Sequence, residues 1–180
     1  MTENPWKTLG ITNIYENPWI KLEHHDIVNP AGKDGIYSIV HFKNLAIGII
    51  PIDKEGNTWI VGQYRYALKE YSWEIPMGGG LIGIDTLESA QRELKEETGL
   101  QAKKWTNILK IHTSNSVTDE AGYVFLAENL TEGETEFEET EVLQIKKLPF
   151  QAVLNMVMSG EITDSLSIAG ILKAARILGY

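Results

Sequence analysis

Three glutamates are spaced so that a helix would carry them on one face. Glu96 and Glu97 lie three and four residues after Glu93, and residues at these separations are neighbours on a helix surface. Their mutual repulsion disappears when a hard divalent cation such as Mg²⁺ or Mn²⁺ binds, because such ions take carboxylate and phosphate oxygens as ligands. Arg92, four residues before Glu96, can hold one carboxylate in position. The spacing therefore indicates a metal-binding helix face, although an ordinary solvated helix surface has the same composition.

A glycine-rich segment, residues 77–83, precedes this helix, and we expect it to be a loop. It follows a short predicted strand at 72–75 that Pro76 must end. The G-x-G-x-x-G spacing within it also matches the dinucleotide-binding pattern, in which a helix N-terminus binds pyrophosphate directly. Three glutamates on that helix would repel pyrophosphate unless a metal ion lay between them. We therefore favour metal-mediated binding over a nucleotide-cofactor fold.

The helix itself has clear start and stop signals. Asp85 is a suitable N-cap, and Glu88 can complete a capping box. Gly99 stands where a left-handed C-cap residue is expected. An apolar stripe at spacings of three and four, formed by Leu87, Ala90 and Leu94, predicts the face that packs on the core.

Segments rich in Ile, Val, Tyr and Trp predict the strands that must position this helix. They cover residues 19–28, 36–43, 45–52, 58–64, 72–75, 105–112, 122–127 and 142–148, whereas residues 149–158 and 164–178 have helical patterns. This order predicts an α/β (α+β) fold, with a mixed β-sheet packed against helices.

Composition excludes several function classes. The 180 residues include no cysteine, which excludes disulfides, zinc–thiolate sites, iron–sulfur clusters and a thiol nucleophile. The net charge of −9, from 25 acidic and 16 basic residues, disfavours a nucleic-acid partner. The sequence has no signal-peptide pattern and no apolar run of membrane-spanning length. We therefore expect a cytoplasmic protein with no membrane partner.

The four histidines show no metal-binding spacing. His24 and His25 are adjacent on a predicted strand and so point to opposite faces, while His41 and His112 are isolated in the sequence. We therefore expect no histidine metal site, and no Ser-His-Asp arrangement is detectable from spacing.

The segment from Gly78 to Leu100 resembles the Nudix box of the Nudix hydrolases. The family pattern is Gly, five residues, Glu, seven residues, then Arg-Glu-aliphatic-x-Glu-Glu-x-Gly-aliphatic. The second part is matched by Arg92-Glu93-Leu94-x-Glu96-Glu97-x-Gly99-Leu100. Ile84 stands where the family has its first Glu, a residue that supports the box Arg, and Asp85 is the nearest substitute.

The resemblance extends beyond the box. The approach segments Gln63-Tyr64-Arg65-Tyr66 and Trp73-Glu74-Ile75-Pro76 are similar to those of the ADP-ribose pyrophosphatase-like branch, and the likeness covers roughly residues 17–178. It implies a Nudix-type α/β/α sandwich with a mixed sheet. It also implies that residues 45–180 form the hydrolase domain, and that residues 1–44 form a β-strand extension through which the protein makes a homodimer.

The activity implied is hydrolysis, with Mg²⁺ or Mn²⁺, of the pyrophosphate bond of a nucleoside diphosphate linked to a sugar. ADP-ribose or a related ADP- or GDP-sugar would give a nucleoside monophosphate and a sugar phosphate. A catalytically silent Nudix-like module that senses a nucleotide sugar is the alternative. A nucleoside triphosphate pyrophosphohydrolase is disfavoured by the segment before the box.

The resemblance also assigns roles within the box. Glu93 and Glu97 are expected as catalytic metal ligands, and Glu96 as a ligand or support. The Met77 carbonyl is expected as a further metal ligand. Gly78 belongs to the substrate-binding turn, and Arg92 is structural support.

Outside the box, several residues have both a functional and a structural interpretation. Arg65 is expected to contact substrate phosphate or ribose, or else to be a surface residue at a strand end. Glu120 would lie on a loop that shapes the substrate pocket, or be an ordinary loop residue. Glu138 or Glu139, in the acidic run at 132–141, would be the base or an extra metal ligand, or part of a solvated loop. Four aromatic residues could stack on a base or belong to the core: Trp59, Tyr64, Tyr66 and Trp73.

Overall fold

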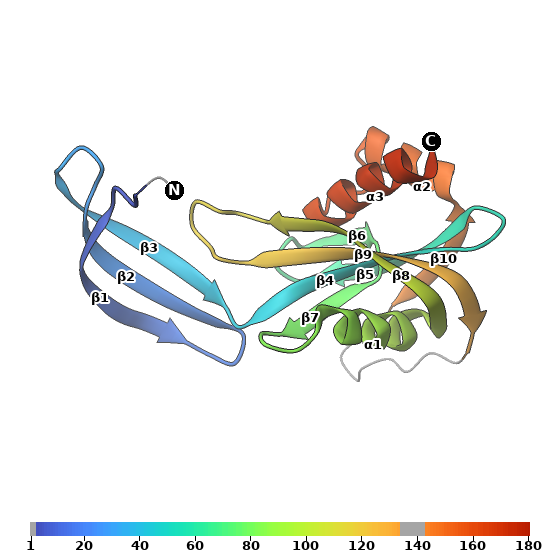
Figure 1. Cartoon of the computed structure of the whole chain (residues 1–180), viewed down its shortest axis with the longest axis horizontal. Helices are drawn as coiled ribbons and strands as arrows, with labels where there is room; N and C mark the ends of the chain where they lie inside the picture. Colours follow the sequence, from blue (N-terminus) through green and yellow to red (C-terminus); the bar gives the residue numbers. More distant parts are fainter. Residues whose placement is uncertain (1–2, 134–142) are drawn as a thin grey trace. The chain divides into compact units, whose positions relative to one another are not determined.

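The structure is a computed structural model, and it describes residues 3–133 and 143–180 (Figure 1). The chain forms two compact units, which we describe separately. One contains residues 1–44 and 112–120, and the other contains residues 45–111 and 121–180. No helix in the described ranges is long and apolar enough to cross a membrane.

The first unit is a three-stranded antiparallel sheet in the order β1-β2-β3 (Figure 1). Its strands are β1 (Lys7–Glu16), β2 (Ile20–Val28) and β3 (Asp34–Phe42). The Asn17 side chain accepts hydrogen bonds from the backbone N–H groups of Trp19 and Ile20, both at 2.8 Å, and so shapes the turn between β1 and β2. Strand β1 is not among the predicted strands, because two register shifts interrupt its alternation of apolar and polar residues.

The second unit is built on a seven-stranded sheet. The main path is β10-β5-β4-β9-β8, with β6 paired to β5 and β7 paired to β4. Strand β4 is parallel to β9 and antiparallel to β5, so the sheet is mixed, as predicted. The strands are β4 (Asn44–Ile52), β5 (Asn57–Arg65), β6 (Glu70–Glu74), β7 (Met77–Leu81), β8 (Leu100–His112), β9 (Ala121–Glu132) and β10 (Gln144–Pro149).

Helices cover both faces of this sheet (Figure 1). They are α1 (Thr86–Thr98), α2 (Phe150–Ser159) and α3 (Ser165–Leu178). Strand β4 shows how the layers form, because alternate residues point to opposite faces. Ile47 and Ile49 pack in the core cluster with α1, whereas Ile50 and Ile52 pack with α2 and α3. The predicted α/β/α sandwich is therefore confirmed.

Helix α1 begins and ends where the sequence predicts. The Asp85 carboxylate accepts a hydrogen bond from the Leu87 N–H at 2.9 Å, and Gly99 ends the helix at φ 71°. The preceding segment differs from the prediction, since residues 77–81 form strand β7 instead of a loop. Its glycines hide the strand because they carry no side chains to alternate. Gly80 allows close packing, since a Cβ there would lie 2.8 Å from Ile47 Cγ1.

A partly buried carboxylate, that of Asp53, fixes the turn between β4 and β5 and gives a pH-dependent prediction. Asp53 accepts hydrogen bonds from the Asn57 N–H at 2.7 Å and from Lys147 at 2.8 Å. Burial raises the pKa of Asp53, but Lys147 and Asn57 outweigh it and lower that pKa to about 2. In the unfolded chain the pKa of Asp53 is roughly 3.9. Because the pKa is lower in the folded protein, ionised Asp53 stabilises the fold at a pH above the unfolded value. This contribution is lost as the pH falls through about 2.

We expect Asp53→Asn to lower the free energy of unfolding by about 1–2 kcal/mol at pH 7, because hydrogen bonds to a charged group are lost. The difference from wild type should shrink below pH 4. Urea unfolding at pH 7 and pH 2.5 measures this. Asp34→Asn, at an exposed aspartate, is the control. Equal destabilisation by Asp53→Asn at both pH values would contradict the assigned ion pair.

Candidate active site

Glu97 is the most deeply buried of the three helix glutamates. It is 1% exposed, and its Oε2 accepts a hydrogen bond from the Met77 N–H at 2.9 Å. This bond ties the last turn of α1 to the first residue of β7. Burial of a carboxylate is unfavourable unless donors or cations surround it, so this position is built for a negative group that interacts with positive charge.

Glu93 lies one turn earlier on α1, beside Gly78. It is 7% exposed. A Cβ at position 78 would lie 2.2 Å from Glu93 Oε2, so no larger residue fits here without moving the carboxylate. Gly78 is thus a position of close approach between β7 and the helix. The carboxylates of Glu93 and Glu97 therefore both lie against the start of β7.

Arg92 holds the third carboxylate, that of Glu96, in position. It donates to Glu96 at 2.7 Å and to the Gly79 carbonyl at 2.9 Å, and it also contacts Glu93. Partial burial lowers the pKa of Arg92, but the charges of Glu93 and Glu96 outweigh this and raise it. The guanidinium therefore stays charged and holds both carboxylates.

These contacts of Arg92 do not involve position 84. The Ile84 side chain is 48% exposed, and the Asp85 carboxylate caps the helix by accepting from the Leu87 N–H. Asp85 therefore does not take over the supporting role of the family's first Glu. The Gly79 carbonyl, Glu93 and Glu96 hold Arg92 in its place.

Arg65 forms an ion pair that sequence reasoning did not identify. Its Nε donates to Glu74 Oε1 at 2.9 Å, and its Nη2 contacts the other Glu74 oxygen. Glu74 is 3% exposed. Its hydrogen bond is the largest contribution to the raised pKa of Arg65, and the negative charges of Asp164 and Glu97 raise that pKa further. The register pairs Arg65 with Glu70 and Glu74 with Val61, so the ion pair joins residues of adjacent strands that are not directly opposite, and no sequence period predicts it.

An open cleft of about 370 Å³ lies along this ion pair. It is lined by Arg65, Tyr66, Ala67, Leu68, Ser72, Glu74, Thr163 and Asp164. Tyr66 is 92% exposed and Tyr64 is 62% exposed, so both rings are accessible. Trp59 belongs to the core cluster beside α1, and Trp73 packs against the core cluster beside α2 and α3. The structure thus divides the four candidate stacking residues into two packed tryptophans and two accessible tyrosines.

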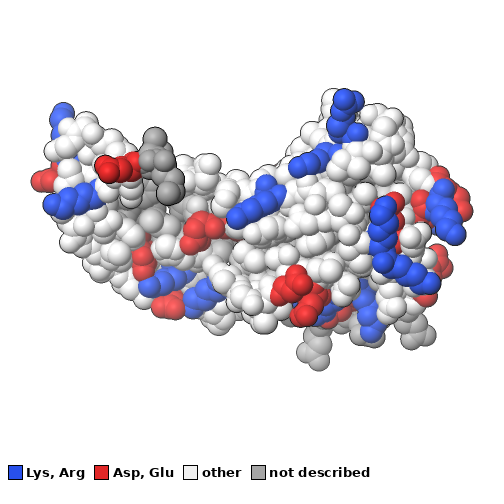
Figure 2. Space-filling view, viewed as in Figure 1, with Lys and Arg blue, Asp and Glu red and all other residues white. Residues whose placement is uncertain are grey.

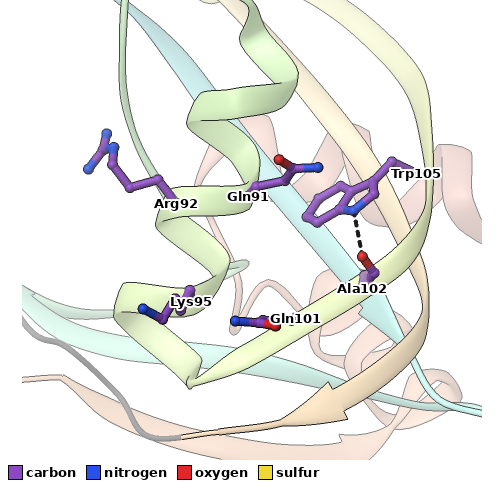
Figure 3. A pocket seen from close by; sticks show the side chains of 6 residues that line it. All are labelled: Gln91, Arg92, Lys95, Gln101, Ala102 and Trp105. Atoms are coloured by element: carbon purple, nitrogen blue, oxygen red, sulfur yellow. Dashed lines mark hydrogen bonds between the residues drawn. The ribbon is translucent and has the colours of Figure 1, made fainter.

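A second cavity, of about 350 Å³, lies between α1 and β8 (Figure 3). The Arg92 side chain points away from Trp105, whose indole N–H donates to the Ala102 carbonyl at 3.0 Å. None of the three glutamates lines this cavity. We therefore do not place the metal site there. Its lining residues are Gln91, Arg92, Lys95, Gln101, Ala102 and Trp105.

The other predicted site residues lie in different parts of the chain. Glu120 belongs to the first unit, where the Thr113 hydroxyl donates to its carboxylate. Glu138 and Glu139 lie outside the described residues. The role of the Met77 carbonyl as a ligand stays a prediction, since the structure shows Met77 acting through its N–H.

The residues present fit a hard divalent cation. Two buried carboxylates and a third that is anchored by Arg92 offer oxygen ligands, which Mg²⁺ and Mn²⁺ prefer. No cysteine or histidine is among them. Removing carboxylates from water costs free energy that a bound cation repays.

Comparisons with known proteins identify the family to which the chain is similar. The NUDIX domain model matches residues 42–164, and the model of the nucleoside diphosphate sugar hydrolase N-terminal domain matches residues 6–40. An ADP-ribose pyrophosphatase of Bacillus subtilis is 34% identical, covering 88% of this chain and 86% of its own. An ADP-ribose pyrophosphatase of Mycobacterium tuberculosis is 31% identical, and the match covers 98% of this chain and 86% of that protein.

A crystal structure described as an ADP compounds hydrolase has the same fold. Its TM-score is 0.88 at 19% identity, and the match covers 99% of this chain and 97% of that one. At this identity the likeness bears on the fold alone.

Proposed function

The chain belongs to the Nudix family, and on that basis we propose that it hydrolyses the pyrophosphate bond of a nucleoside diphosphate sugar. ADP-ribose or a related ADP- or GDP-sugar would yield a nucleoside monophosphate and a sugar phosphate. The observation that carries the proposal is the burial of Glu93 and Glu97 against Met77 and Gly78, the first two residues of β7.

The catalytic roles follow from the position of each side chain. Glu93, Glu96 and Glu97 would hold Mg²⁺ or Mn²⁺, with the Met77 carbonyl as a further ligand. When bound, such an ion neutralises phosphate oxygens and lowers the pKa of a ligating water. Arg92 keeps the carboxylates of Glu93 and Glu96 in place through its hydrogen bonds.

Three further roles complete the proposed mechanism. Arg65, held by Glu74 at the edge of the cleft, would contact a substrate phosphate through its remaining donors. Proton removal from the attacking water needs a carboxylate, and Glu138 or Glu139 is proposed for that role. Glu120 is proposed to shape the substrate pocket.

A catalytically silent module loses its main support. Only Ile84 favoured that alternative, and the structure holds Arg92 without any contribution from position 84. The three ligand glutamates are all present.

A substrate panel tests the proposal. Purified protein with Mg²⁺ is offered nucleotide sugars, dinucleotides and nucleoside triphosphates, and products are separated by chromatography. We expect AMP and ribose phosphate from ADP-ribose, and no reaction after chelation by EDTA. If no member of the panel is hydrolysed with metal, the proposed activity is wrong.

An accessible tyrosine gives a second test. Tyr66 lines the cleft beside Arg65, and stacking of a base on an aromatic ring contributes about 1–3 kcal/mol. We expect Tyr66→Ala to raise the KM for ADP-ribose about 10-fold with little change in kcat. Tyr66→Phe keeps the ring and should behave as wild type. An unchanged KM in Tyr66→Ala would exclude base stacking at this residue.

The proposed assembly is a homodimer formed through residues 1–44, with residues 45–180 as the hydrolase domain. Support comes from apolar side chains of β1 that are more than half exposed: Leu9, Ile11, Ile14 and Tyr15. Light scattering of the purified protein tests it, and a monomer at micromolar concentration would overturn it.

The proposed partner is a small nucleotide sugar in the cytoplasm, without nucleic acid or membrane. In support, the basic side chains on the face shown in Figure 2 are scattered among acidic and uncharged ones. The net charge of −9 also opposes binding to phosphate backbones.

A further inference from the structure

Two histidines and a glutamate meet on one face of the first unit. Glu23 and His25 are two residues apart on β2 and so point to the same face. His41 on β3 pairs with Lys21, two residues from Glu23, which places its side chain on that face as well. One ligand atom from each of Glu23, His25 and His41 lies within 4.8 Å of the others. Pairing of the strands thus brings together two histidines that are distant from one another in the sequence.

The hydrogen bonds in this cluster need an additional positive charge. Glu23 Oε2 lies 2.9 Å from His25 Nε2 and 3.1 Å from His41 Nε2. His41 Nδ1 lies 2.7 Å from Asp119 Oδ2. A neutral imidazole has one N–H and can donate to only one carboxylate. His41 faces a carboxylate at both ring nitrogens, so either a second proton or a metal ion must lie at one of them.

The donor set and its surroundings favour a metal ion. Two imidazole nitrogens and a carboxylate oxygen are ligands that Zn²⁺ takes in sites with an open fourth position. The ligand atoms around a tetrahedral Zn²⁺ are about 3.3 Å apart, given bonds of about 2.0–2.1 Å, close to the separations from Glu23 Oε2. Asp119 fixes Nδ1 of His41 as the protonated nitrogen, which is how carboxylates orient metal-binding histidines.

Asp119 is itself held in place. Its Oδ1 accepts from the Phe42 N–H at 3.0 Å, so the carboxylate that orients His41 is fixed to the end of β3. The side chains of Glu23 and His25 are each 12% exposed, and that of His41 is 31% exposed. The cluster is therefore shielded but open to an entering ion.

We propose that Glu23, His25 and His41 form a binding site for a divalent transition metal, with Zn²⁺ as the best match. The ion is bound by Nε2 of both histidines and Oε2 of Glu23, and water completes the fourth position. Binding fastens β2 to β3 and, through Asp119, to segment 112–120. Lys21 contacts the other oxygen of Glu23 and reduces the affinity by its charge.

A zinc titration tests the site independently of the proposed hydrolysis. The full chain is titrated with Zn²⁺ against a chromophoric indicator at pH 7.5, with excess Mg²⁺ present to occupy the carboxylates of α1. We expect one Zn²⁺ per chain that competes with the indicator. His25→Ala and His41→Ala should each weaken binding at least 10-fold, as loss of one ligand does.

His24→Ala is the matched control. His24 is the neighbouring residue on β2, points to the opposite face and lies 3.5 Å from Asp26. Zinc affinity should not change in this variant. Lys21→Gln provides a gain of function, since removing the ammonium should tighten zinc binding several-fold without deleting a ligand.

Two results would overturn the proposal. In the first, wild-type protein takes up no Zn²⁺ under these conditions, which means that a proton on His41 alone holds the cluster together. In the second, His24→Ala weakens binding as much as His41→Ala, which places the ion elsewhere. Circular dichroism of each variant shows that the strands are intact, and the Lys21→Gln result stands even if a histidine variant does not fold.

Discussion

Glu97→Gln is expected to lower kcat for ADP-ribose hydrolysis by about 10³-fold or more. A carboxamide has the size of the carboxylate and can still accept the hydrogen bond from the Met77 N–H, so the fold should persist. The lost negative charge weakens the hold on the divalent ion, whose charge stabilisation of the transition state is worth several kcal/mol. Steady-state kinetics at saturating Mg²⁺, together with thermal unfolding, measure both effects.

The control for this variant lies on the same helix. Glu88→Gln removes a charge from an exposed residue in the first turn of α1 and should leave kcat within about two-fold. A Glu97→Gln enzyme with near wild-type kcat would show that the buried carboxylate does not serve the reaction. An equal loss in both variants would point to helix charge in general.

Gly78→Ala is expected to lower kcat/KM by about 10–100-fold and to raise the Mg²⁺ concentration needed for half-maximal rate. The added methyl would lie 2.2 Å from the Glu93 carboxylate, which must therefore move. Changes to groups that orient metal ligands typically cost about 10–100-fold in affinity or activity, and we expect a similar loss when the ligand itself is moved. Rates measured across a range of Mg²⁺ concentrations test this prediction.

A control substitution at Gly160 separates an effect on stability from an effect on activity. Gly160 ends α2 at φ 79°, with open space around its Cβ position. Gly160→Ala should cost about 1 kcal/mol of stability through backbone strain and leave kcat unchanged. If Gly78→Ala lowers the melting temperature but not the rate, Gly78 is a packing residue only.

The helix that carries the site could be predicted from sequence because its signals are local. Asp85, the apolar stripe and Gly99 act within a few residues of one another, and the structure confirms both ends of α1. Strand β7 was predicted wrongly as a loop, since Gly78, Gly79 and Gly80 have no side chains to reveal a period of two. Strand β1 was missed because its bulges disturb the same period.

The contacts that sequence could not provide are those between strands. Glu74 holds Arg65 from an adjacent strand, and His41 meets Glu23 through the register of β2 and β3. Hydrogen bonding between strands determines which of these side chains lie side by side, and residue spacing along the chain does not predict that pairing. For this reason, the spacing of the histidines along the chain does not reveal that His41 lies beside Glu23 and His25.

Direct measurement of metal binding tests the central claim. Binding of Mn²⁺ is followed by electron paramagnetic resonance in the His25→Ala/His41→Ala background, where the site proposed in the first unit cannot contribute. We predict that this protein depletes free Mn²⁺ and that Glu93→Gln or Glu97→Gln abolishes the depletion. Unchanged Mn²⁺ binding in both glutamine variants would contradict it.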